Sequence, residues 1–324
     1  MQLFPGRNAY LLVLIVAAVD AIWLAFSSVS LAGSEFVLLS VQVAILLVLS
    51  WAIERRSFSA PVMERLSGRL VHFMQGIAFL LVAWVALRVL NQASMSFDLP
   101  LTDKMLIHWD SFLPIDWHSY FRFVQLNGGV QTVLDYSYTS LSAVSFIGLV
   151  LFVWKNEMKR ARYFMETFMI AAVVCTAIGV FLPAKGSVAT YFGDVSSIAH
   201  FKTVPGVYAI DALNQMRSGL PHTLRIGEMP GLTVFPSFHT AAGIVLAVSF
   251  WRTSLFPAVF VYTVVMIAAT PVFGAHYFID LIAGAVVAVA ICAAFAFMPF
   301  YKGMFARRDA REDWEPSCEG AVSF

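Results

Sequence analysis

Residues 277–298 read YFIDLIAGAVVAVAICAAFAFM and contain a single charged side chain, Asp280. An α-helix needs about 20 mostly apolar residues to cross the roughly 30 Å hydrocarbon core of a bilayer. This stretch meets that requirement, and it is too long for an ordinary buried strand. We therefore predict that residues 277–298 form a transmembrane helix.

Similar stretches recur along the 324-residue chain, in which 60% of residues are hydrophobic and 13% are charged. This composition lies outside the usage of soluble domains and predicts an all-α, polytopic transmembrane helical bundle of about eight spans. The predicted spans cover residues 10–29, 36–53, 70–90, 130–154, 163–182, 235–251, 255–275 and 277–298. The first span could be a signal peptide, but its length and Asp20 favour a retained helix.

Charge and cysteine usage exclude several classes of function. Lys and Arg total 21 and Asp and Glu total 20, so no basic field is available to bind nucleic acid. Cys175, Cys292 and Cys318 have neither a CxxC nor a Cys/His spacing, which argues against a disulfide scaffold or a zinc site. We expect no metal and no cofactor.

Basic residues predict how the chain is oriented, because short cytoplasmic loops retain Lys and Arg. They cluster after the second, fourth and eighth spans: Arg55, Arg56, Arg65, Arg69; Lys155, Lys159, Arg160, Arg162; Lys302, Arg307, Arg308, Arg311. We expect these segments and both termini to be cytoplasmic. The opposite, outer side would then hold residues 91–129 and the long loop 183–234.

The first of these outer segments contains DKMLIHWDSFLPIDWHSYFR at 103–122, which mixes aromatic and charged residues and is too polar to span a membrane. It predicts helices that lie in the membrane interface, as a brace at the membrane surface or as a lid or acceptor-binding element. The 52-residue loop that follows the fifth span is long enough to be functional or disordered.

His276 and Asp280 are four residues apart at the start of the eighth span, so both side chains lie on one helix face. A carboxylate that accepts the Nδ1 proton of an imidazole leaves the Nε2 lone pair free, as a nucleophilic histidine requires. The pair could instead be a polar contact that is satisfied within the bundle.

A second element, FPSFHT at 235–240, opens the sixth span. Pro is tolerated in a first helical turn and Ser237 can cap it, so the positive end of the helix would face outward as an anion site. His239 lies one turn in, where a protonated imidazole could donate to a phosphate ester oxygen, although a histidine at a helix start can also be only interfacial.

The outer loop also contains Lys185, Lys202, Arg217 and Arg225, against the usual charge bias of outer loops. Each could be a solvated charge, but together they suggest an anionic ligand. The inferred orientation places these cations, both histidines and Asp280 on one side of the membrane.

FPSFHT followed by GAHYFIDLIAG at 274–284 resembles the second and third motifs of the type 2 phosphatidic acid phosphatase superfamily. The residues of the two motifs most closely resemble those of the inositol phosphorylceramide synthase (aureobasidin-resistance) branch. The resemblance implies a six-helix catalytic core over residues 70–298, after a two-helix addition at 1–69 and before a cytoplasmic tail at 299–324.

By this resemblance, His276 would attack phosphorus, Asp280 would orient the His276 ring, and His239 would protonate the departing oxygen. Ser237 and the neighbouring backbone amides would hold the phosphoryl group. The chain departs from the phosphatase branch at the start of the third motif, where Ala269-Thr270 stands in place of Ser-Arg, and it lacks the Lys and Arg-Pro of the first motif. Lys185, Arg217 and Arg225 are the candidate phosphate-binding cations.

These residues favour a metal-independent lipid phosphotransferase that acts at the outer membrane face through a phosphohistidine. Its partners would be membrane lipids (a phospholipid, lipid phosphate or ceramide-like lipid) and a hydroxyl acceptor or water. If water is the acceptor, the protein is a lipid phosphate phosphatase; a transporter or scramblase is the alternative of another class. The lack of a retrieval signal and of cysteine pairs favours a bacterial inner membrane.

Overall fold

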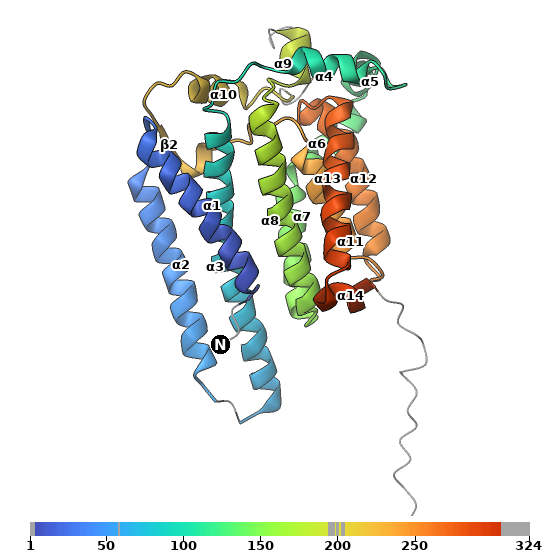
Figure 1. The fold of residues 1–324 in the computed structure, drawn as a ribbon. Coiled ribbons are helices and arrows are strands. Elements are labelled where there is room, and N and C mark those ends of the chain that lie inside the picture. Colours follow the sequence, from blue (N-terminus) through green and yellow to red (C-terminus); the bar gives the residue numbers. More distant parts are fainter. Residues whose placement is uncertain (1–3, 58, 194–197, 199–200, 202–204, 306–324) are drawn as a thin grey trace, which may run out of the picture.

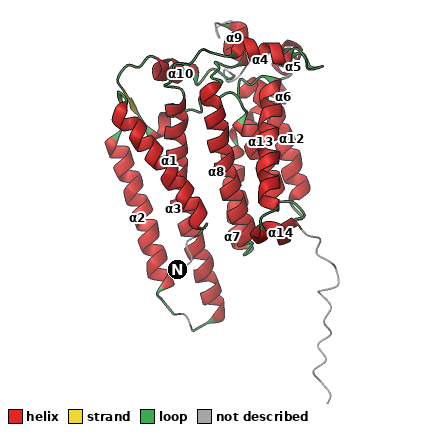
Figure 2. Ribbon diagram, viewed as in Figure 1, coloured by secondary structure: helices red, strands yellow, loops and turns green. Residues whose placement is uncertain are grey.

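The computed structural model describes residues 4–57, 59–193, 198, 201 and 205–305, and it is a bundle of long helices capped at one end by short ones (Figure 1). Figure 2 shows that helices dominate the chain and that strand is confined to one small pairing. The prediction of an all-α polytopic protein is therefore confirmed. The last nineteen residues of the predicted tail, 306–324, lie outside the described residues.

Six of the described helices are long and apolar enough to cross a membrane: α1 (Arg7–Phe26), α2 (Gly33–Glu54), α3 (Pro61–Ser94), α8 (Met158–Phe181), α12 (Phe256–Phe273) and α13 (Phe278–Ala296). The predicted span 130–154 is a helix pair, α6 (Gly128–Thr139) and α7 (Leu141–Trp154), bent by 53°. The predicted span 235–251 is α11 (Phe238–Ser249), whose 12 residues extend about 18 Å and do not cross a bilayer core alone. The chain is an integral membrane protein.

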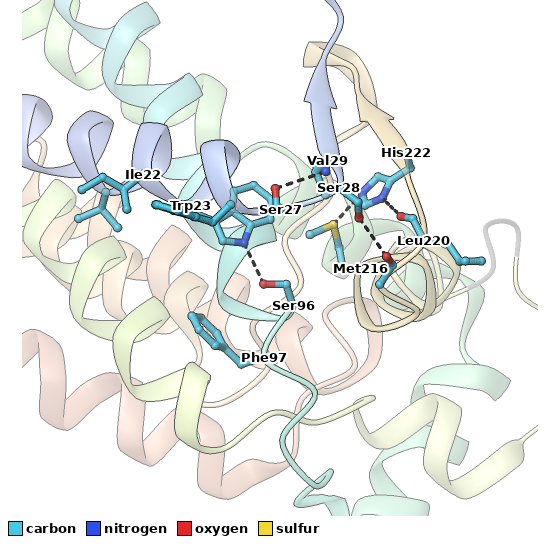
Figure 3. Close-up of a pocket in the computed structure, with 13 residues that line it drawn as sticks. Ile22, Trp23, Ser27, Ser28, Val29, Ser96, Phe97, Met216, Leu220 and His222 are labelled. Carbon is cyan, nitrogen blue, oxygen red and sulfur yellow. Dashed lines mark hydrogen bonds between the residues drawn. The ribbon is translucent and has the colours of Figure 1, made fainter.

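The N-terminal helices pack on one side of the bundle, where α1 and α2 both contact α3. The short strand β1 (Val29–Leu31) pairs in parallel with β2 (His222–Leu224) and joins these helices to the long loop. A pocket of about 610 Å³ lies between α1 and β2, where Trp23 donates to Ser96 and His222 contacts Met216 (Figure 3). This pocket shares no lining residue with the cavity described below.

Helix α11 lies at the centre of the other half of the bundle, in contact with α7, α8, α12 and α13. Its small residues Ala241 and Ala242 are fully buried, as are Val245 and Leu246. This face lets the neighbouring helices approach closely, so the start of α11 is held against the start of α13.

Short helices cover one end of the bundle (Figure 1). They are α4 (Asp103–Asp110), α5 (Trp117–Leu126), α9 (Ser187–Phe192), α10 (Ile210–Arg217) and the 3-10 turn η2 (Ile226–Glu228). The opposite end contains α14 (Pro299–Phe305), the α2–α3 connection with Arg55 and Arg56, and the start of α8 with Lys159, Arg160 and Arg162. The two ends of the bundle therefore differ in both charge and architecture.

Candidate active site

His276 lies in the short connection between α12 and α13, at the covered end of the bundle. Its Nδ1 is 3.2 Å from Oδ2 of Asp280, and the same Oδ2 accepts the backbone N–H of Tyr277 at 2.9 Å. Asp280 is fully buried and His276 is 3% exposed. The Asp280 carboxylate thus fixes the orientation of the His276 imidazole and also caps the start of α13.

Burial lowers the pKa of His276 to about 4, and the Val234 carbonyl has a smaller, opposing effect. The imidazole is therefore neutral near pH 7. A neutral ring whose Nδ1 faces a carboxylate can present Nε2 as a lone pair.

The backbone before His276 adopts an uncommon conformation, because Ala275 has a φ of +54°. Two loops pack directly on it: the Ser187 N–H donates to the Ala275 carbonyl at 2.8 Å, and Gly206 approaches so closely that a Cβ there would lie 2.6 Å from that of Ala275. Gly206 itself has a φ of +66°, which glycine tolerates best. The neighbouring loops thus hold the turn that presents His276.

Helix α11 brings His239 to the same end of the bundle. Ser237 caps this helix, since its Oγ accepts the Thr240 N–H at 3.3 Å, and its own N–H donates to the Asp280 carbonyl at 3.0 Å. The ring of His239 stacks on Tyr138, with centroids 4.2 Å apart, and the Tyr138 hydroxyl lies 3.0 Å from that of Tyr208. The two motifs predicted from the sequence are therefore joined by a direct backbone hydrogen bond.

Two carboxylates of α4 hold the loops of the site. Asp110 accepts the backbone N–H groups of Phe278 and Ile279, at 3.0 and 2.7 Å, and so caps the start of α13. Asp103 accepts the N–H groups of Lys185 and Gly186, both at 3.0 Å. Helix α4 therefore binds both the start of α13 and the loop that contains Lys185 and Gly186.

Asp103 also accepts hydrogen bonds from the hydroxyls of Thr190 and Tyr277, at 3.1 and 2.9 Å. From α5, the Trp117 indole N–H donates to the backbone carbonyl of His276 at 3.1 Å. Helices α4 and α5 thus both bind the segment that contains His276 and the start of α13.

A cavity of about 950 Å³ opens in front of the two histidines. The charged and polar residues that line it include His239, His276, Lys185, Arg88, Asn91, Tyr138, Tyr208 and Glu228. Its remaining walls are mostly apolar and come from α3, α7 and α8, including Leu80, Trp84, Leu149, Phe164, Phe168 and Met169. Along α3 the lining runs from Ile77 to Asn91, a rise of about 21 Å.

The predicted phosphate-binding residues are placed differently from one another. Lys185 lines the cavity. Arg217 pairs with Asp98 at 2.7 Å and Arg225 with Glu35 at 2.8 Å, and neither lines the cavity. Ser237 is fully buried in its capping role and does not line the cavity either.

Sequence reasoning missed Arg88, Asp103, Asp110 and Tyr138 as parts of the site. Arg88 carried a usable signal, because an ionisable residue inside an apolar span is a functional candidate by default. Asp103 and Asp110 had a weaker one, as acidic residues within an aromatic interfacial stretch. Nothing in the sequence indicates which backbone amides they cap.

The fold and this site define a helical membrane protein whose histidine–aspartate pair and second histidine share a partly apolar cavity. Residues 104–294, more than half of the chain, match the family model described as PAP2 superfamily, and the chain belongs to that superfamily. Membership supports a phosphatase or phosphotransferase type of activity on lipid phosphates. Comparisons with curated proteins and with solved structures found no match.

Proposed function

We propose that the protein cleaves a phosphate ester of a membrane lipid through a phosphohistidine on His276. The observation that carries this proposal is the cavity itself, because one end holds the His276–Asp280 pair and His239 while the rest is an apolar space between membrane helices. A lipid phosphate has the matching chemistry, an anionic group joined to hydrocarbon chains.

The reaction would be a double displacement. In the first step, Nε2 of His276 forms a bond to phosphorus while the P–O bond to the leaving alcohol breaks. His239 gives its proton to the departing oxygen, and the bound phosphate anion favours the protonated form of this buried imidazole. In the second step an acceptor oxygen attacks phosphorus, the P–N bond breaks, and the acceptor proton passes to His239. Asp280 stabilises the imidazolium character that develops on His276. No step requires a metal.

We favour a hydroxyl acceptor, and thus head-group transfer similar to that of inositol phosphorylceramide synthases. Support comes from the cover of short helices and from the burial of His276, which is 3% exposed, since a covered site restricts competing water. Lipid phosphate hydrolysis is the second candidate, favoured by membership of the PAP2 superfamily. We further propose that the covered end faces the outside of a bacterial inner membrane and that both termini are cytoplasmic.

The test uses the full-length protein in nanodiscs, with EDTA present and a phospholipid or lipid phosphate that carries ³²P. We expect turnover by the natural chain and none by His276→Ala. A new labelled lipid that forms only when a hydroxyl lipid or polyol is added supports the transferase. Release of inorganic phosphate supports the phosphatase. Equal turnover by the variant contradicts the phosphohistidine on His276, and no turnover by either chain favours the transporter alternative.

A further inference from the structure

Arg88 is the feature of the cavity that the mechanism above does not use. It lies in α3, one turn after Trp84, and its Cζ is 5.6 Å from the Trp84 ring centroid. Its Nη1 donates to the backbone carbonyl of Met229 at 2.7 Å. Within the described part of the chain, Arg88 forms no salt bridge, whereas Arg217 and Arg225 each pair with a carboxylate.

A guanidinium without a counter-ion inside a membrane protein is costly, so it marks a place where an anion binds. Arg88 lines the same cavity as both histidines and Lys185. Arg88 is close enough to His239 and Tyr208 for their charges to interact, and a bound anion would offset the repulsion between Arg88 and a protonated His239. The missing anion would therefore lie beside the proposed nucleophile and acid.

The position of Arg88 is fixed relative to the start of α11. Three residues on α3 bind the loop that leads into this helix: Arg88 donates to Met229, Gln92 Nε2 donates to the Pro230 carbonyl at 2.6 Å, and Asn91 Oδ1 accepts the Leu232 N–H at 2.7 Å. These bonds continue up to the residues that precede the FPSFHT motif. The Arg88 side chain is thus held at a fixed position relative to the segment that leads into α11, the helix that contains His239.

Helix α3 also changes character at this point. Below Arg88 its cavity-lining residues are apolar, among them Leu80, Leu81, Trp84 and Leu87, and above it stands Asn91. Arg88 thus lies where the cavity-lining face of α3 changes from apolar to polar. A lipid whose phosphate reaches Arg88 would lay its chain along the apolar part of the same helix.

We propose that Arg88 binds the phosphoryl group of the lipid substrate. A guanidinium can donate two parallel N–H bonds to two phosphate oxygens, which suits a clamp better than a point charge does. Helix α3 precedes the matched residues 104–294, so this clamp would come from outside the family segment and would supply an arginine that the motifs of this chain lack. The inference rests on the proposed function.

The test measures binding and turnover separately. Affinity for inorganic phosphate is measured by calorimetry on full-length protein in nanodiscs, for the natural chain, Arg88→Gln and Arg88→Lys. The matched control is Arg65→Gln, which removes an exposed arginine from the far end of the same helix. Loss of charge-assisted hydrogen bonds predicts about 10- to 100-fold weaker binding for Arg88→Gln, a smaller loss for Arg88→Lys and no change for the control.

Kinetics with a labelled lipid phosphate should show the same order, with a rise in KM for both Arg88 variants. Unchanged affinity and unchanged kcat/KM in Arg88→Gln, with a normal circular dichroism spectrum, would overturn the proposal. The outcome is separable from that of the proposed function. Phosphate binding that depends on Arg88 without any lipid turnover supports the anion site and contradicts the proposed enzymatic function. Turnover that depends on His276 but not on Arg88 supports the enzymatic function and contradicts the anion site.

Discussion

The backbone N–H of Ser237 donates a hydrogen bond to the backbone carbonyl of Asp280, 3.0 Å away. This bond joins the first residues of α11 to the first turn of α13. Because the bond joins two backbone groups, side-chain motion does not loosen it. It holds α11, which contains the proposed acid, beside α13, which follows the proposed nucleophile. The relative position of His239 and His276 therefore depends on how closely these two helices approach.

Gly284 sets that approach. A Cβ at this position would lie 2.3 Å from the Ser237 carbonyl oxygen, which is backbone and cannot turn aside. We expect Gly284→Ala to separate the helices and to destabilise the protein by about 1–3 kcal/mol, with a loss of activity larger than the loss of folded protein. Thermal unfolding in nanodiscs and the lipid assay measure the two effects.

Gly68→Ala is the control, because a Cβ at Gly68 in α3 meets nothing within 4 Å. This variant should be neutral or slightly more stable, since alanine favours helix more than glycine does. Equal behaviour of the two variants would show that the α11–α13 contact does not limit activity.

The two carboxylates of α4 give a second prediction. Asp110→Ala removes the acceptor for the N–H groups of Phe278 and Ile279 and should cost about 1 kcal/mol as a lost helix cap. Because the same helix carries Asp280 and follows His276, we expect kcat to fall by roughly 10²-fold. Asp110→Asn, which keeps an acceptor oxygen, should retain most of the activity.

Asp116→Ala provides the comparison, since Asp116 caps the neighbouring α5 through the Ser119 N–H and is linked to His276 only indirectly, through the Trp117 indole of the same helix. It should lose stability with a much smaller fall in kcat. Similar kcat values for Asp110→Ala and Asp116→Ala would argue that α4 is only a surface brace.

Much of this architecture is predictable from the sequence, because it depends on short continuous stretches of the chain. A membrane span needs a continuous apolar run, so the long helices follow from composition, and helix-start motifs such as FPSFHT and HYFID identify where α11 and α13 begin. The superfamily is also evident from these two motifs, and the family match confirms it.

Partners far apart in the chain are the part that the sequence does not contain. Lys185, Arg217 and Arg225 look alike in the sequence, yet two of them pair with Asp98 and Glu35. Whether a loop arginine faces a carboxylate or a cavity depends on tertiary packing, which charge counting does not reveal. Arg88 stands inside the third predicted span, and the sequence does not indicate which face of that helix borders the cavity.

The low pKa of His276 predicts the acid limb of the pH profile. Burial lowers this pKa from 6.5 to about 4, so the folded protein keeps a neutral imidazole where the unfolded chain binds a proton. As pH falls from 6.5 toward 4, the group removes stability, and the nucleophile itself is lost only near pH 4. We expect kcat/KM for a phosphodiester donor, whose charge is constant over this range, to decline only near that pH. An acid limb near pH 6.5 would contradict the burial of His276 in the working enzyme.

The role of His239 as proton donor can be separated from binding by the choice of leaving group. His239→Gln should slow cleavage of a glycerolipid by about 10²- to 10⁴-fold, because an alkoxide leaves poorly without a proton. The loss should be much smaller with a nitrophenyl phosphate ester, whose leaving group departs unprotonated. His276→Ala should be inactive on both substrates, and an equal loss on both in His239→Gln would remove the acid assignment.

The most direct test of the central claim is to trap the covalent intermediate. Protein in nanodiscs is mixed with ³²P-labelled lipid phosphate, denatured in alkaline detergent, in which phosphohistidine survives, and analysed by peptide mapping. Label bound to the peptide that contains His276, up to one per chain and absent from His276→Ala, is the predicted result. Rapid turnover with no protein-bound label, or label that persists in His276→Ala, would contradict the account.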